Sequence, residues 1–287
     1  MVRMQFSIEL GYDIDAPGCD MILSIQAART RQQTVVSESL TLSQPLSQKN
    51  YVAAATYTRH LRLQANPGPL TVRYEATVDL NHFRAEPDQI GEIHIADLPG
   101  EVLQYIYPSR YCPSDRLLRL ANKEFGQLPQ GYRRAQAICD WVTQRVTFQS
   151  NSSNGSTTAL DTLIERVGVC RDFAHLMIAL CRAVNIPARF VTGFDYGADP
   201  ALGPPDFHAY VEVYLGQRWY LFDPSGTAIP MGFVRFATGR DAADCAFATL
   251  FGGVRGAAPI LNAVAIPNAL GELEVPHHVA YGLSTDS

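Results

Sequence analysis

One stretch of this sequence, residues 166–182 (RVGVCRDFAHLMIALCR), decides much of its fold. After Cys170 the apolar residues recur at intervals of three and one, which is typical of a helix packed along one side. They are Phe173, Leu176, Met177, Leu180, Cys181 and Val184. Asn185 and Pro187 should end this helix, and Gly168 permits a sharp backbone turn before it. We therefore expect Cys170 in the first turn of a buried helix.

The first turn of a helix is a favourable place for a reactive cysteine. The first backbone N–H groups have no partner within the helix, and the helix dipole is positive there. This field favours the thiolate, which is the nucleophilic form of cysteine. A buried structural cysteine fits the helix pattern equally well, so the interpretation of Cys170 depends on residues downstream.

A predicted hairpin supplies two partners for Cys170. Residues 208–215 alternate strictly, Gly216-Gln217 suits a two-residue type II′ turn, and residues 218–223 return. In this register His208 and Asp223 are diagonal neighbours on one face, so the imidazole can reach the carboxylate.

Two rival groups fit less well. Glu212 shares the face of His208 but lies roughly 13 Å away along the strand, so Asp223 is the better partner. His175 lies about 140° around the helix axis from Cys170. We expect His175 to be a hydrogen-bonded residue behind the site.

Four sequence blocks together resemble bacterial transglutaminase-like proteins. They are residues 168–176 (GVCRDFAHL), 185–189 (NIPAR), 208–213 (HAYVEV) and 219–226 (WYLFDPSG). The resemblance implies a papain-like core after an N-terminal β domain. It also implies Cys170 as nucleophile, His208 as general base and acid, and Asp223 as the orienting carboxylate.

Two features depart from the animal members of that superfamily. Residues 153–158 lack the tryptophan that helps to hold the oxyanion there, and Trp141 is expected in the core. The backbone N–H of Cys170 is then one oxyanion donor, and the sequence does not identify the second. We find no EF-hand-type acidic loop, so calcium activation is not expected.

The rest of the chain predicts an α+β fold in which a β-sandwich, residues 1–100, precedes the catalytic core. Expected strands span residues 5–14, 21–27, 34–42, 54–63 and 70–78. The core, residues 101–270, should pack helices on an antiparallel sheet, and residues 271–287 should form a C-terminal tail. Expected helices run from a Ser114 cap to Phe125, over residues 132–146, and from a Thr158–Asp161 capping box to Arg166.

Composition narrows the class of protein. The 287 residues are 47% hydrophobic and 18% charged, with a net charge of −5, which fits a globular protein. No basic run suggests nucleic acid as a partner, and no apolar run is long enough to span a membrane. We see no signal peptide. Six cysteines without a C-x-x-C pair favour a reducing cytoplasm and no zinc.

These observations predict a cysteine-dependent enzyme that transfers an acyl group from an amide or peptide bond through a thioester on Cys170. Water would make it a protease or amidase and an amine a transglutaminase; hydrolysis is weighted slightly higher. The substrate would be a protein or peptide, with no cofactor and no metal; the oligomeric state is left open. The alternatives are a non-catalytic binding module on the same fold and acyl transfer from a coenzyme A thioester. No phosphate-cradling glycine loop supports the last of these.

Overall fold

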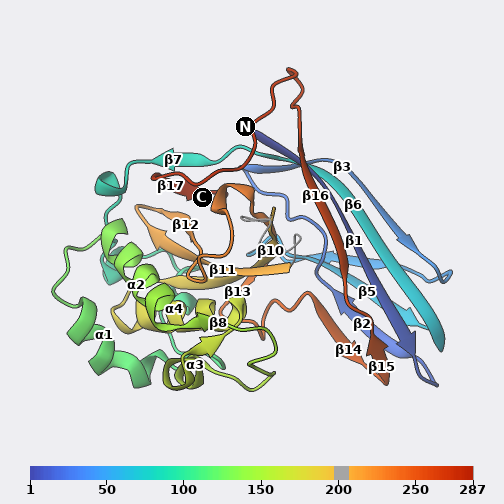
Figure 1. Cartoon of the computed structure of the whole chain (residues 1–287), viewed down its shortest axis with the longest axis horizontal. Coiled ribbons are helices and arrows are strands. Elements are labelled where there is room, and N and C mark those ends of the chain that lie inside the picture. Colours follow the sequence, from blue (N-terminus) through green and yellow to red (C-terminus); the bar gives the residue numbers. More distant parts are fainter. Residues whose placement is uncertain (197–206, 287) are drawn as a thin grey trace.

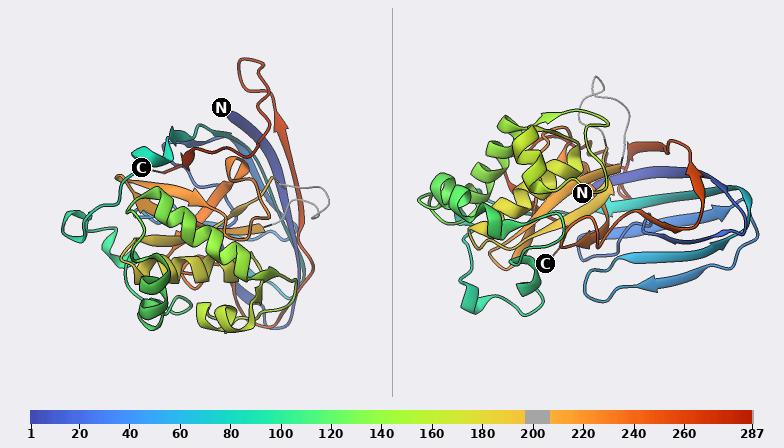
Figure 2. Two further views of the ribbon diagram at one scale, coloured as in Figure 1. Left: turned by 60° about the vertical axis from the view of Figure 1, so that its left-hand side comes forward. Right: turned by 90° about the horizontal axis from the view of Figure 1, so that it is seen from below.

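The computed structural model describes residues 1–196 and 207–286, which form three layers (Figure 1). Helices cover one face of a four-stranded central sheet, and a β-sandwich covers its other face (Figure 2). The helices are α1 (Leu118–Phe125), α2 (Tyr132–Arg145), α3 (Ala159–Glu165) and α4 (Cys170–Ala183). The mixed α/β class with an N-terminal β domain is thus confirmed. Within the described residues, no helix combines the length and apolar character needed to span a bilayer.

The β-sandwich contains two antiparallel sheets. One has the order β15-β1-β6-β3, with β16 also paired to β1, and the other has the order β14-β2-β5-β4. The N-terminal strands are β1 (Val2–Ile14), β2 (Cys19–Leu23), β3 (Gln33–Leu42), β4 (Lys49–Val52), β5 (Arg59–Ala65) and β6 (Gly68–Leu80). The expected strand over residues 54–63 begins only at Arg59, because a turn precedes it in which Tyr57 has a φ of 56°.

C-terminal strands complete these sheets. They are β14 (Ala248–Phe251), β15 (Val254–Gly256) and β16 (Ile260–Ile266), which pair with β2 and β1. Further on, β17 (Gly282–Ser284) pairs with β7 (Phe83–Ala85). The strands β14 to β16 lie after residue 100 and β17 lies after residue 270, yet all four pair with strands that lie before residue 100 and are more than 190 residues distant in sequence. These pairings therefore cross both of the expected divisions.

The central sheet has the order β12-β11-β10-β13. Its strands are β10 (Ala188–Phe194), β11 (Phe207–Leu215), β12 (Arg218–Phe222) and β13 (Val234–Gly239), and a short parallel pair, β8 (Thr147–Phe148) and β9 (Val167–Gly168), lies before α4. Ala209 and Val211 face the helices, whereas Tyr210 packs into the sandwich core. Both faces of the sheet are therefore buried.

Local geometry confirms part of the sequence reasoning and corrects two details. The hairpin pairs Leu215 with Arg218, as expected. Its turn is of type I′ rather than II′, because Gly216 and Gln217 both have positive φ, 51° and 69°. The capping box of Thr158 before α3 is present. Ser114 is no cap, however, since it is the first residue of a 3₁₀ turn that precedes α1.

Candidate active site

Cys170 is the first residue of α4, as predicted, and it is partly exposed. Asp172 caps this end of the helix, because its carboxylate accepts the Val169 N–H at 2.9 Å. A Cβ on Gly168 would lie 2.8 Å from the Asp172 Cβ. Gly168 does not have positive φ, so the glycine is needed for this close approach rather than for a turn.

His208 and Asp223 meet at the open end of the hairpin. His208 lies near the start of β11, and its Nε2 is 3.1 Å from Oδ1 of Asp223, just beyond β12. Oδ1 also accepts the Ser225 N–H at 3.1 Å and the Ser225 hydroxyl at 2.6 Å, while Oδ2 accepts the Ala228 N–H at 2.9 Å. Hydrogen bonds to both carboxylate oxygens therefore fix the orientation of the Asp223 side chain.

The charges of His208 and Asp223 stabilise each other. Burial opposes the charged imidazole, but the Asp223 carboxylate and then the Cys170 sulfur raise the pKa of His208 well above its ordinary value. Burial likewise opposes the charged carboxylate, but His208 and the Ser225 and Ala228 donors lower the pKa of Asp223. Both directions favour an imidazolium–carboxylate pair at neutral pH.

Cys170 and His208 open into one pocket of about 370 Å³. It lies between the start of α4 and the strands β10 and β11, and Ala242, Ala246 and Phe247 also line it, from the segment that follows β13. The three residues singled out from the sequence thus lie as a chain of neighbours, with His208 between Cys170 and Asp223.

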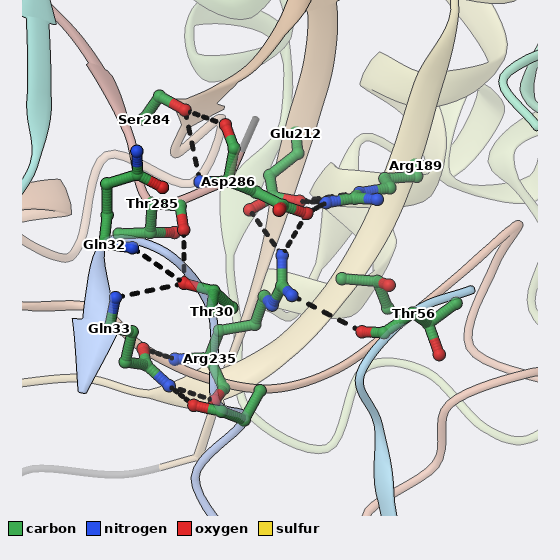
Figure 3. A network of polar contacts seen from close by, with 12 residues as sticks. Thr30, Gln32, Gln33, Thr56, Arg189, Glu212, Arg235, Ser284, Thr285 and Asp286 are labelled. Atoms are coloured by element: carbon green, nitrogen blue, oxygen red, sulfur yellow. Dashed lines mark hydrogen bonds and ion pairs between the residues drawn. The ribbon is translucent and has the colours of Figure 1, made fainter. Parts of the chain in front are cut away.

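Glu212, the rival carboxylate, has other partners (Figure 3). Arg189 Nε donates to Glu212 at 2.6 Å, and Asp286 lies 2.5 Å from Arg189 and 2.6 Å from Arg235. These four side chains form a buried cluster of two positive and two negative charges. Its fourth member, Asp286, lies in the expected tail, and nothing in the local sequence pattern signalled this role.

His175 lies behind the site, as predicted. Its Nε2 accepts the Ala242 N–H at 3.2 Å. Its ring stacks on Tyr111 and packs at a tilt of 35° against Phe190, each at 5.0 Å between centroids. Burial, reinforced by Arg171 and Arg182, lowers the pKa of His175 well below its ordinary value. A histidine with so low a pKa, whose Nε2 already accepts the Ala242 N–H, binds a proton too weakly to be the base.

Residues 153–158 lie next to the site and contain no tryptophan, but they make polar contacts with it. Ser153 and the Asn154 carbonyl both accept from Arg171, the residue after Cys170. Trp141 packs edge-on against Phe125 within the helical layer. Across residues 1–196 and 207–286, His, Cys, Asp and Glu side chains form no group of three that could hold a metal ion.

Comparison with known proteins gives the family. The transglutaminase-like superfamily matches residues 119–224, and the bacterial transglutaminase N-terminal domain matches residues 2–101. A crystal structure from Cytophaga hutchinsonii, described as a candidate cysteine protease, is 36% identical, with a TM-score of 0.90, and the match covers 99% of this chain and 97% of that one.

Two mycobacterial relatives are uncharacterized proteins. The one from Mycobacterium leprae is 24% identical over 262 residues, which are 86% of this chain and 91% of that protein. The one from Mycobacterium tuberculosis is 33% identical over 109 residues, which are 34% of this chain and 35% of that protein. From the two family matches and the full-length structural likeness, the chain belongs to the transglutaminase-like superfamily, with a bacterial transglutaminase N-terminal domain.

Proposed function

We propose that this protein is a cysteine-dependent acyl-transfer enzyme that cleaves an amide or peptide bond through a thioester on Cys170. One observation carries the proposal: His208 is hydrogen-bonded to Asp223 and shares a pocket with Cys170. A cysteine, a histidine and an orienting carboxylate in this order are the components of nucleophilic acyl transfer.

The first half-reaction forms the thioester. Asp223 binds Nε2 of His208, which leaves Nδ1 for the thiol proton. The Cys170 sulfur attacks the carbonyl carbon, and the backbone N–H of Cys170 donates to the developing oxyanion. His208 then gives its proton to the nitrogen of the scissile bond, the C–N bond breaks and the amine leaves.

The second half-reaction releases the acyl group. His208 removes a proton from the incoming nucleophile, which attacks the thioester carbonyl, and Cys170 leaves as the thiolate. With water the product is a carboxylic acid, and with an amine it is a new amide. We favour water, because the full-length relative from Cytophaga hutchinsonii is described as a candidate protease. On this proposal the substrate is a protein or peptide, met in the cytoplasm.

The test is an assay that distinguishes peptide-bond cleavage, side-chain amide hydrolysis and amine incorporation on one protein substrate. Denatured casein is incubated with the protein and dansylcadaverine, and new amino termini, released ammonia and incorporated fluorescence are measured together. We expect new amino termini with the wild type and with Cys19→Ala, which alters a cysteine in the sandwich, but none with Cys170→Ala. Amine incorporation without cleavage would make the enzyme a transglutaminase.

A non-catalytic binding module would give a different pattern. Casein would then bind equally well to the wild type and to Cys170→Ala, and intact-mass measurement would detect no acyl adduct on Cys170. That result, or full activity in Cys170→Ala, would overturn the proposed mechanism.

A further inference from the structure

The pocket beside Cys170 has a predominantly apolar lining. Its apolar members are Phe190, Phe207, Ala209, Ala242, Ala246 and Phe247. Phe207 and Phe247 stack in parallel, with 4.5 Å between ring centroids and 11° between ring planes. The volume of about 370 Å³ falls within the range of small-ligand pockets, roughly 300–1,000 Å³. A large side chain therefore has room beside the sulfur.

The polar side chains of the lining, apart from Cys170 and His208, are already hydrogen-bonded to the protein. The Tyr111 hydroxyl donates to the Gly155 carbonyl at 2.7 Å, and the Thr192 hydroxyl donates to the Cys245 carbonyl at 2.6 Å. The Arg171 guanidinium is shared among acceptors on Asp172, Ser153 and Asn154. A polar or charged guest would have to give up its hydration without new partners from these side chains.

We infer that this pocket binds a large apolar side chain of the acyl donor, such as phenylalanine or leucine, next to the carbonyl that Cys170 attacks. The inference rests on the proposed function and adds the substrate class. Burial of such a side chain against Phe207 and Phe247 holds the carbonyl beside the sulfur. A carboxamide or carboxylate side chain gains no such binding.

Activated esters provide the test, because they acylate a reactive thiol whatever the natural amide is. The thiolate attacks the ester carbonyl, 4-nitrophenolate leaves and the thioester forms. Two series are compared, the 4-nitrophenyl esters of acetyl-Xaa-Gly and acetyl-Gly-Xaa. Xaa is phenylalanine, leucine, alanine, glutamine or glutamate. The second-order rate of 4-nitrophenolate release is corrected for the rate with Cys170→Ala.

In at least one series, we expect the phenylalanine and leucine esters to react at least about tenfold faster than the alanine ester. The glutamine and glutamate esters should be no faster than the alanine ester. Intact mass should show one acyl group, assigned to Cys170. Equal rates for all side chains, or a preference for glutamine or glutamate, would overturn the inference while the acyl adduct still supported the proposed function.

A matched pair of variants locates the preference in this pocket. Ala246 is exposed and lines the pocket, whereas Ala243 is exposed in the same segment but outside the lining. Ala246→Arg should lower the rate with the phenylalanine ester at least about fivefold and raise the relative rate with the glutamate ester. Ala243→Arg should keep the wild-type order. The same change in both variants would place the preference elsewhere, and no acylation by any ester would overturn the inference and the proposed function together.

Discussion

Replacing Asp223 with asparagine should slow acylation of Cys170 by about 10²- to 10⁴-fold, while the protein still folds. The wild-type carboxylate is negatively charged, lies 3.1 Å from His208 and accepts from Ser225 and Ala228 as well. The substitution keeps the shape of the side chain but removes its charge and one of its two acceptor oxygens. The substitution should therefore slow acylation by disturbing His208 and leave the packing of the side chain unchanged.

The size of the expected loss of rate depends on which of two orientations the new side-chain amide adopts. With its oxygen toward His208, the imidazole keeps its tautomer but loses the charge that raises its pKa, and the amide NH₂ faces the Ala228 N–H, donor against donor. With its NH₂ toward His208, Nε2 must accept. Nδ1 then carries a proton and cannot take the one from Cys170. The first arrangement corresponds to the lower end of the range and the second to the upper end.

The assay measures acylation by the fastest 4-nitrophenyl ester, with the folded fraction set by circular dichroism at the assay temperature. Glu212→Gln is the matched control, because Glu212 is on the same strand as His208 but binds Arg189. It should lower the melting temperature, since a buried cation loses a charged partner, yet keep the rate per folded molecule within about fivefold. A larger loss of rate in Glu212→Gln than in Asp223→Asn would refute the assignment of the orienting carboxylate.

Three further predictions use other readouts. At pH 6.5, iodoacetamide should modify Cys170 before the other five cysteines, and His208→Ala should slow this reaction at least about tenfold, by site-resolved mass spectrometry; an unchanged rate would show that the two residues do not interact. Asp286→Asn should lower the melting temperature by roughly 5–10 °C, because it unbalances the buried cluster. Burial opposes the charged form, yet the arginines lower the pKa of Asp286 from 3.8 to about 2, a contribution of about 2.5 kcal/mol. That contribution to stability is present above pH 3.8 and lost as the pH falls through 2, so the loss of stability caused by Asp286→Asn should shrink over this range. A stability difference between the wild type and Asp286→Asn that does not change with pH would contradict the role of Asp286 in the cluster. Gly168→Ala should destabilise the protein by about 1–3 kcal/mol through its contact with the helix cap, whereas Gly155→Ala, with open space around the new Cβ, should be nearly neutral in denaturant unfolding.

Local sequence determined the elements of the candidate site. The apolar spacing after Cys170 is a property of one helix, and the alternation from His208 with a two-residue turn fixes one hairpin register. That register alone places His208 next to Asp223. The catalytic roles themselves stay predictions until the variants are measured.

The fine geometry of turns and caps was only partly encoded. A glycine followed by glutamine is compatible with either primed turn, and the two turns differ in the φ of the second residue. Only the folded backbone showed that Gln217 takes a positive φ, which makes the turn type I′. The sequence also signalled Gly168 as special. Only the packing showed that the reason is the position of Asp172.

Tertiary structure alone decided which distant segments meet. The local sequence of residues 248–266 does not indicate which strands they pair with, because strand pairing depends on contacts between residues far apart in sequence. The same is true of Asp286, which enters the arginine cluster from the far end of the chain. The pocket beside Cys170 is likewise assembled from a helix, two strands and residues 242–247. A local pattern specifies what each segment is, whereas burial of both faces of the central sheet specifies where each segment lies.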